Sequence, residues 1–244
     1  IIKQKGKFGN LNTNGTLLTK EIIHKLVEIE WDEITFSIDS AEPKIHDFLR
    51  GGKKTFEKCI ENIKFLKKTR DSQNKVSPAL EMHSVITNLN FNKLHKIVRL
   101  ASKLGVESVN FTHLMQDTNL AKNFNLDKAQ IIQFKKEAEK SFLLGKKLGI
   151  FTNLDNYIES KLNDNVGEYL GILKTTSVKK DKKNILSAIC FEPWTQMSIF
   201  SDGTVGLCGV WNPKIKKYNI KNKSFDECWN GKFFNEIRNK LIKQ

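Results

Sequence analysis

The sequence predicts an α/β fold of parallel strands with intervening helices, followed by a small α+β extension that contains a β-hairpin. Short apolar runs alternate with amphipathic helical patterns over residues 9–152, as in βα units around a parallel sheet. A polar segment with a run of lysines occupies residues 153–187. From residue 188, two short alternating runs flank Asp202-Gly203, which is typical of a hairpin with a type I′ turn. We therefore predict domains at 1–152 and 188–244, joined by a polar linker with helices at 153–187.

The first βα unit is placed by its capping signals. Residues 9–12 form a short strand pattern that leads into Thr13-Asn14-Gly15. Thr19 is a suitable N-cap for the helix that follows, and Leu18 and Ile23 have the spacing of a hydrophobic staple across that cap. This unit therefore has a well-defined helix start.

The next units follow the same order. The second has a strand, a loop through Arg50-Gly51-Gly52, and a helix from Thr55. The third has a strand and a helix that ends at Gly105, the usual residue type for the C′ position. A fourth strand follows at once. The predicted strands are 33–38, 80–87 and 106–114.

Two further helices have explicit start signals. Asp127 begins a long helical pattern that ends near Leu148-Gly149. Ser224-Phe225-Asp226-Glu227 forms a capping box, so we expect a helical region after the hairpin. Cys228 lies on the apolar face of that region, as Cys59 does on the helix from Thr55. Both cysteines are interpreted as small core residues and excluded as metal ligands.

The composition limits the class of protein. The 244 residues include 41 lysines and arginines against 27 acidic residues, a net charge of +14, which raises the alternative of a nucleic-acid-binding protein. Only four of these cations are arginines and the lysines are spread along every helix, so we favour solvated helix faces and expect no specific nucleic acid. No apolar run is long enough for a membrane span. Four scattered cysteines favour a reducing cytoplasm.

Polar residues follow the predicted strands. The strand ends offer Thr13-Asn14-Gly15, Ser37-Ile38-Asp39-Ser40, Thr87-Asn88 and Thr112-His113. In barrels of βα units the active-site groups lie at the carboxyl ends of the strands, so these residues are the first candidates for a site. Each motif taken alone is more typical of a turn or a capped loop than of a functional site. Together they line one rim of the predicted sheet.

Two sets of residues resemble a known family. The first set is Thr13-Asn14-Gly15-Thr16-Leu17-Leu18, Phe36-Ser37-Ile38-Asp39-Ser40, Ile45-His46-Asp47, Arg50-Gly51 and Phe56. The second is Cys190, Gly203, Cys208, Asn219-Ile220, Ser224, Trp229-Asn230 and Arg238. The first resembles the middle of a radical S-adenosylmethionine barrel, and the second resembles the SPASM or twitch extension of such enzymes. The resemblance implies a partial, TIM-like (β/α) barrel at 1–152, comprising about strands three to six, and a SPASM-like domain at 188–244.

The resemblance also implies a function and its cofactors. Such enzymes use S-adenosylmethionine and a [4Fe–4S] cluster to generate a 5′-deoxyadenosyl radical that abstracts hydrogen from a peptide, sugar or small-metabolite substrate, with an electron donor that reduces the cluster. By resemblance, Ser37 and Asp39 face the ribose or methionine part of the cofactor, and Asn14 lines the pocket. Arg50 is either a carboxylate partner of the cofactor or a loop salt bridge. No catalytic residue is assigned.

The CxxxCxxC motif of the family does not occur in the sequence. Because Thr13-Asn14-Gly15 matches the end of the third barrel strand, we expect the cluster ligands and two further βα units upstream of Ile1. We also expect the extension to continue beyond Gln244. The chain then represents an internal piece of a longer protein and is inactive alone.

Cys190 and Cys208 flank the predicted hairpin. By the family spacing they are ligands of an auxiliary iron–sulfur cluster, and two buried apolar cysteines or a non-catalytic scaffold with structural zinc are the alternatives. Sulfatase-maturating relatives carry an aspartate directly after the cysteine equivalent to Cys208, where this chain has Gly209. This difference leaves the substrate open.

Overall fold

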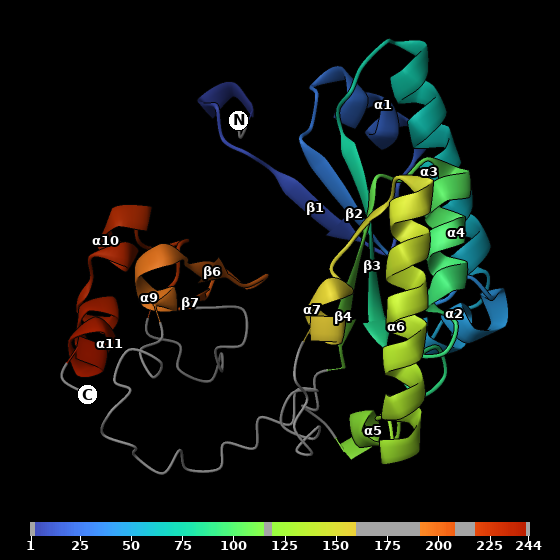
Figure 1. Cartoon of the computed structure of the whole chain (residues 1–244). Coiled ribbons are helices and arrows are strands. Elements are labelled where there is room, and N and C mark those ends of the chain that lie inside the picture. Colours follow the sequence, from blue (N-terminus) through green and yellow to red (C-terminus); the bar gives the residue numbers. More distant parts are fainter. Residues whose placement is uncertain (1–2, 115–118, 160–190, 208–217, 243–244) are drawn as a thin grey trace. The chain divides into compact units, whose positions relative to one another are not determined.

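The computed structural model describes residues 3–114, 119–159, 191–207 and 218–242 (Figure 1). The described residues up to Glu159 belong to one compact unit, and those from Phe191 belong to a second. No helix in these described ranges has both the length and the apolar character that a bilayer span requires. Each unit is considered by itself below.

The first unit is a five-stranded parallel sheet with helices between the strands. The strands are β1 (Asn10–Thr13), β2 (Glu33–Ser37), β3 (Ala79–Ile86), β4 (Ser108–His113) and β5 (Phe151–Thr152), and their order in the sheet follows the sequence. The helices are η1 (Lys3–Lys5), α1 (Lys20–Glu28), α2 (Pro43–Arg50), α3 (Thr55–Ser72), α4 (Leu94–Leu104), α5 (Asn119–Lys122), α6 (Lys128–Leu148) and α7 (Asp155–Glu159). This architecture confirms the predicted α/β class.

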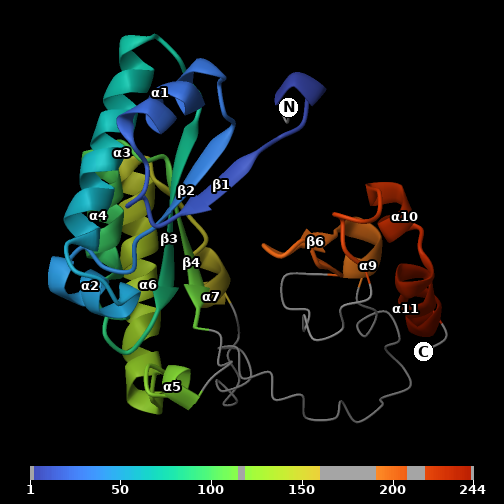
Figure 2. The same cartoon turned by 180° about the vertical axis from the view of Figure 1, so that it is seen from behind.

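The long helices α1, α3, α4 and α6 all cover the same face of the sheet (Figures 1 and 2). The core lies between these helices and the sheet, and its strand residues include Ile34, Phe36, Leu80, Met82 and Phe111, all at most 1% exposed. Burial of such side chains is the main stabilising contribution to the unit. The opposite face of the sheet carries the alternate residues of each strand.

The local signals in the sequence set the helix ends as predicted. The Thr19 hydroxyl accepts a hydrogen bond from the backbone N–H of Ile22, while Leu18 and Ile23 are both buried in the core on either side of this cap. Asp127 and Gln130 form a reciprocal capping box at the start of α6. Gly105 ends α4 with a φ of +66°. Caps depend on a few neighbouring residues, so their prediction does not require the tertiary structure.

Two short elements differ from the prediction. The segment expected to be a loop before Arg50-Gly51-Gly52 contains the helix α2, with Pro43 in its first turn and Gly51 at its C-cap with a φ of +63°. Eight residues give too few turns for the apolar period to stand out. Strand β5 has only two residues, and it exists because Phe151 and Thr152 pair with Ser108 and Val109 of β4. The side chains of Leu154 and Tyr157, inside the segment expected as linker, belong to the core of this unit.

The second unit is small and mixed. It contains α9 (Glu192–Thr195), β6 (Ser198–Ile199), β7 (Val205–Gly206), α10 (Phe225–Trp229) and α11 (Lys232–Ile242), and β6 pairs with β7 as the predicted antiparallel hairpin. Ser224 and Glu227 form the predicted capping box at α10.

The hairpin turn differs from type I′, which requires positive φ at both central residues. The backbone N–H of Gly203 bonds to Phe200 O at 2.8 Å, and Gly203 has positive φ whereas Asp202 does not. Ser201 and Asp202 are therefore the central residues of the turn. Gly203 follows them as a left-handed residue, as in a three-residue hairpin loop.

The core of the second unit is built around aromatic rings. Val205, Cys228, Phe233 and Phe234 are at most 5% exposed. The guanidinium of Arg238 lies 4.5 Å from the ring centroid of Trp229, and its Nε and Nη1 donate to the carbonyl oxygens of Pro193 and Trp229. Arg238 thus joins α9, α10 and α11 within this unit.

Candidate cofactor-binding site

The face of the sheet opposite the helices is mostly polar. Because side chains alternate along a strand, the residues between the buried ones point to this face, which we call the open face. It consists of Asn10, Asn12, Glu33, Thr35, Ser37, Ala79, Glu81, His83, Val85, Ser108, Asn110, Thr112 and Phe151, of which Ala79, Val85 and Phe151 are apolar. A polar sheet face requires water or a polar ligand against it, since buried polar groups must be hydrogen-bonded.

The amino-terminal half of the open face is internally hydrogen-bonded. Glu81 accepts hydrogen bonds from Thr35 Oγ1 at 3.4 Å and from Ser108 Oγ at 3.1 Å, and Glu33 accepts one from Asn10 Nδ2. Burial raises the pKa of Glu33, and the nearby negative charge of Glu81 raises it further. These hydrogen bonds join side chains of neighbouring strands from β1 to β4, on the amino-terminal side of the candidate residues.

The next row of the open face is half-buried. Ser37, His83 and Asn110 lie side by side in the register of β2, β3 and β4. His83 Nε2 shares a hydrogen bond of 3.0 Å with Thr112 Oγ1. The Ser37 hydroxyl makes no hydrogen bond to any residue that the structure describes, and the side chain is half-buried. This row therefore presents unused donors and acceptors near the carboxyl ends of the strands.

Asp39, two residues beyond Ser37, is bound by protein groups on both carboxylate oxygens. Arg50 Nη2 donates to Oδ1 at 2.9 Å, and Arg50 Nε lies 2.6 Å from Oδ2. The backbone N–H of Val85 also donates to Oδ1 at 2.9 Å. Asp39 is 4% exposed, so its charge is balanced by a partly buried guanidinium. The structure thus contains the salt bridge expected as the alternative role of Arg50, while Nη1 of Arg50 has no hydrogen bond within the described residues.

The loop that carries Asp39 is fixed from two sides. Asn90 Nδ2 donates to Asp39 O at 2.6 Å and to Val85 O at 2.8 Å. The backbone N–H of Asp39 donates to His46 Nδ1 at 3.3 Å. Burial lowers the pKa of His46, because a charged imidazolium would lose its hydration there. A neutral His46 keeps Nδ1 available as the acceptor for Asp39.

Asn14 lies at the end of β1 in an exposed turn. Its Oδ1 accepts from the Thr16 backbone N–H at 3.1 Å, as in an Asx-turn. Gly15 follows with a φ of +74°, and Asn62 Nδ2 of α3 donates to its carbonyl at 2.7 Å. The structure therefore gives Asn14 a turn-forming role and leaves its amide nitrogen accessible.

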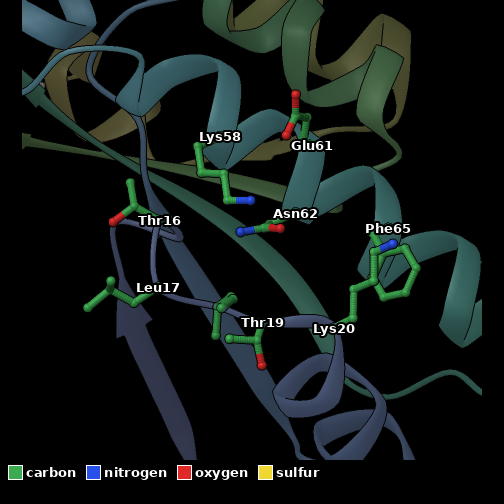
Figure 3. A pocket seen from close by; sticks show the side chains of 9 residues that line it. Thr16, Leu17, Thr19, Lys20, Lys58, Glu61, Asn62 and Phe65 are labelled. Carbon is green, nitrogen blue, oxygen red and sulfur yellow. The ribbon is translucent and has the colours of Figure 1, made fainter.

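A pocket of about 560 Å³ lies beside this turn, between the loop after β1 and helix α3 (Figure 3). It is lined by Thr16, Leu17, Leu18, Thr19, Lys20, Lys58, Glu61, Asn62 and Phe65. None of the four candidate residues Asn14, Ser37, Asp39 and Arg50 lines it. The candidate residues therefore lie at the carboxyl ends of the strands and not in this pocket.

The two predicted metal ligands, Cys190 and Cys208, lie outside the described residues. Within the described ranges no three histidine, cysteine, aspartate or glutamate side chains gather as a metal site. Cys59 and Cys228 are fully buried in the two cores, and burial raises the pKa of the Cys59 thiol to about 12. Their interpretation as core residues is confirmed, since a ligand or nucleophile must be a thiolate.

His83 is the residue that sequence reasoning missed in this region. The alternation of Leu80, Met82 and Ile86 with Glu81 and His83 is the signal that places it on the opposite face from the core. Its neighbours Ser37 and Thr112 come from other strands, so their contact requires the register of the sheet.

Two family models match the sequence. Residues 1–74 match the radical S-adenosylmethionine superfamily, and residues 190–244 match SPASM, an iron–sulfur cluster-binding domain. The first match contains Asn14, Ser37, Asp39 and Arg50, and the second contains Cys190 and Cys208. Their cofactors are S-adenosylmethionine and iron–sulfur clusters.

Characterised proteins and solved structures agree with these matches. The chain is 30% identical over 114 residues to a Pyrococcus furiosus protein that modifies the cofactor of tungsten-containing aldehyde ferredoxin oxidoreductase, and 33% identical over 95 residues to an AdoMet-dependent heme synthase of Methanosarcina barkeri. These alignments cover 47% and 39% of this chain, and 32% and 25% of those proteins.

SuiB of Streptococcus suis bound to S-adenosylmethionine has the same fold, with a TM-score of 0.65 at 14% identity over 97% of this chain and 51% of SuiB. The chain thus spans about half of that structure and a third or less of the two characterised relatives. Taken with the parallel sheet and its polar open face, the two family matches identify a radical S-adenosylmethionine region at residues 1–74 and a SPASM iron–sulfur cluster-binding domain at residues 190–244.

Proposed function

We propose that the carboxyl end of the open face binds S-adenosylmethionine in an enzyme that abstracts hydrogen from a polar substrate, with a peptide as the first candidate. Bound together, the cofactor and a reduced cluster supply a 5′-deoxyadenosyl radical for this step. The observation that carries the proposal is the convergence of Asn14, Ser37, Asp39 and Arg50 at one edge of a polar sheet face. The family match over residues 1–74 supports the identity of the cofactor.

Each candidate residue has a role that its contacts allow. The free Nη1 of Arg50 is suited to the carboxylate of the cofactor, because a guanidinium forms charge-assisted hydrogen bonds with carboxylates. Asp39 has both oxygens occupied, so we expect it to hold Arg50 and the strand end in place. The Ser37 hydroxyl and the Asn14 amide are available to the cofactor.

A peptide substrate is supported by two observations. SuiB, which shares the fold, has been solved with its precursor peptide SuiA at a TM-score of 0.65. The open face offers amide, hydroxyl and carboxylate groups, which match the hydrogen-bonding groups of a peptide. Gly209 in place of the aspartate of sulfatase-maturating relatives argues for a different reaction outcome.

The SPASM domain is proposed to hold an auxiliary iron–sulfur cluster with Cys190 and Cys208 among its ligands. Thiolates are the usual ligands of such clusters, and the family match begins at Cys190. The proposed reaction also requires a [4Fe–4S] cluster and an electron donor that reduces it. Zinc in a non-catalytic scaffold remains the alternative outcome of the metal analysis.

Metal analysis of the complete protein, purified without oxygen, tests this proposal first. We expect iron and sulfide in excess of one cluster, a decrease on Cys190→Ala and Cys208→Ala substitution, and reductive cleavage of S-adenosylmethionine to 5′-deoxyadenosine. Zinc without iron, or iron without cofactor cleavage, would contradict it.

The cofactor site is tested by Arg50→Met. Loss of a charge-assisted hydrogen bond should weaken S-adenosylmethionine binding by about 10- to 150-fold. Arg70→Met is the matched control, because Arg70 donates to Pro78 O, just before β3, and to Glu107, just before β4, and contacts no candidate residue. Equal loss in both variants would indicate a general effect on folding.

A further inference from the structure

We propose that His83 is an additional S-adenosylmethionine-binding residue, which hydrogen-bonds the cofactor through Nδ1 beside Ser37. This inference rests on the proposed function, since it assumes that the cofactor lies at the carboxyl end of the open face. His83 is on β3 directly in register with Ser37 of β2, and both side chains are half-buried on the open face. Of the residues described in this row, these two can contact one ligand together.

The two nitrogens of the imidazole have different surroundings. Nε2 is held at 3.0 Å from the Thr112 hydroxyl of β4. Nδ1 makes no hydrogen bond to any described residue, and it is not among the buried unpaired atoms of the described side chains. The Thr112 contact therefore fixes the ring while Nδ1 remains accessible on the open face.

His83 lies close enough to Arg50 for one cofactor molecule to contact both. Arg50 binds Asp39, which lies two residues beyond Ser37, the partner of His83 in the sheet register. Residues two apart on a strand lie about 6.6 Å apart, so the row of Ser37 and His83 is within reach of a molecule whose carboxylate is held by Arg50. An imidazole and a hydroxyl can both donate and accept hydrogen bonds. That combination suits the neutral hydroxyl groups of a ribose, whereas the guanidinium of Arg50 suits the carboxylate.

The contact with Thr112 offers a purely structural alternative. In that case His83 serves only to join β3 to β4, and Nδ1 has no role. The two roles use different nitrogens of the same ring, so isosteric amides separate them. An asparagine side chain places its amide near the position of Nδ1, and a glutamine side chain places its amide near the position of Nε2.

The experiment measures S-adenosylmethionine binding to the complete, cluster-loaded protein by equilibrium dialysis for His83→Asn, His83→Gln and Thr112→Val. Thermal unfolding of each variant is recorded in parallel. We expect His83→Gln to weaken cofactor binding by about 3- to 10-fold, the range for one neutral hydrogen bond, and His83→Asn to retain most of the affinity. Thr112→Val should have a smaller effect than His83→Gln, because it frees the ring without removing Nδ1.

The inference and the proposed function fail in different ways. If the wild-type protein does not bind S-adenosylmethionine, the proposed function is wrong. If the wild type binds it and His83→Gln binds equally well, the inference about His83 is wrong. The reverse pattern, in which His83→Asn loses affinity and thermal stability while His83→Gln keeps both, would assign the structural role.

Discussion

The two faces of the five-stranded sheet are built from the same strands but differ in residue type and burial. The covered face, against α1, α3, α4 and α6, consists of side chains such as Ile34, Phe36 and Met82 that are fully buried. The open face has Glu81, His83 and Thr112 at the alternate positions. Packing against helices explains the first set. It does not explain the second set, whose members hydrogen-bond to one another across strands, as Glu81 does with Ser108 and His83 with Thr112, or face water or a ligand.

The largest expected effect comes from a truncation on the covered face. Phe36→Ala should lower the free energy of unfolding by about 3–5 kcal/mol, because it removes a fully buried ring and leaves a cavity. Ser37 is the next residue along β2 and lies on the open face. Ser37→Ala should change the free energy of unfolding by about 0.5 kcal/mol or less. Urea unfolding of both variants measures the difference. Similar losses would mean that the open face is also a packed core.

A smaller effect is expected at Gly15, where the site borders the covered face. Gly15 has a φ of +74°, and an added Cβ would lie 2.9 Å from Cys59 Sγ and 3.1 Å from the Phe36 ring. We expect Gly15→Ala to destabilise the protein by about 2–4 kcal/mol, from backbone strain plus overpacking. Gly51→Ala is the control, because its φ is +63° with no atom within 4 Å of the added Cβ. It should cost about 1 kcal/mol, and an equal cost at both positions would exclude the steric contribution.

Ser84 is a polar residue on the covered face. It is fully buried, and its hydroxyl has no hydrogen-bond partner among the residues that the structure describes. Ser84→Ala should therefore stabilise the protein by about 1 kcal/mol, since it removes a buried unsatisfied group. Ser108→Ala on the open face loses a hydrogen bond to Glu81 and should have the opposite sign. Thermal unfolding of the pair is the measurement, and destabilisation by Ser84→Ala would point to an unrecognised partner.

The smallest expected effect is a dependence on pH. Burial lowers the pKa of His46 and of His113 below the unfolded value of about 6.5, so the unfolded chain binds more protons than the folded one. Stability should be complete above about pH 6.5 and decrease as the pH falls below it. The charged groups that also act on the pKa of His46 are Asp39, Arg50, Asp47 and Glu57.

The control for this dependence is His46→Asn, which keeps an acceptor for the Asp39 backbone N–H but does not titrate in this range. Denaturant unfolding between about pH 5 and 7 should show a weaker dependence in the variant than in the wild type, with the remainder due to His113. An unchanged slope would contradict the assignment to His46.

The sequence by itself determined the parts of this protein that depend on neighbouring residues. The order of β1 to β4 and of the long helices between them, the caps at Thr19, Asp127 and Ser224, and the β6–β7 hairpin follow from the apolar period, capping side chains and turn residues. These signals act within a few residues, so they are readable before folding. The polar strand ends could be recognised in the same way.

Only the tertiary structure decided how those polar residues meet. Arg50 is the last residue of helix α2, and this helix brings it to Asp39. The helix is too short to be recognised from the sequence. His83 reaches Ser37 and Thr112 across neighbouring strands, and the two-residue strand β5 exists only through its partner β4. Such contacts depend on the register between distant segments. The identity of the partner in each contact carries no local signal, because hydrogen bonds across a sheet are fixed by strand pairing and not by the sequence on either side.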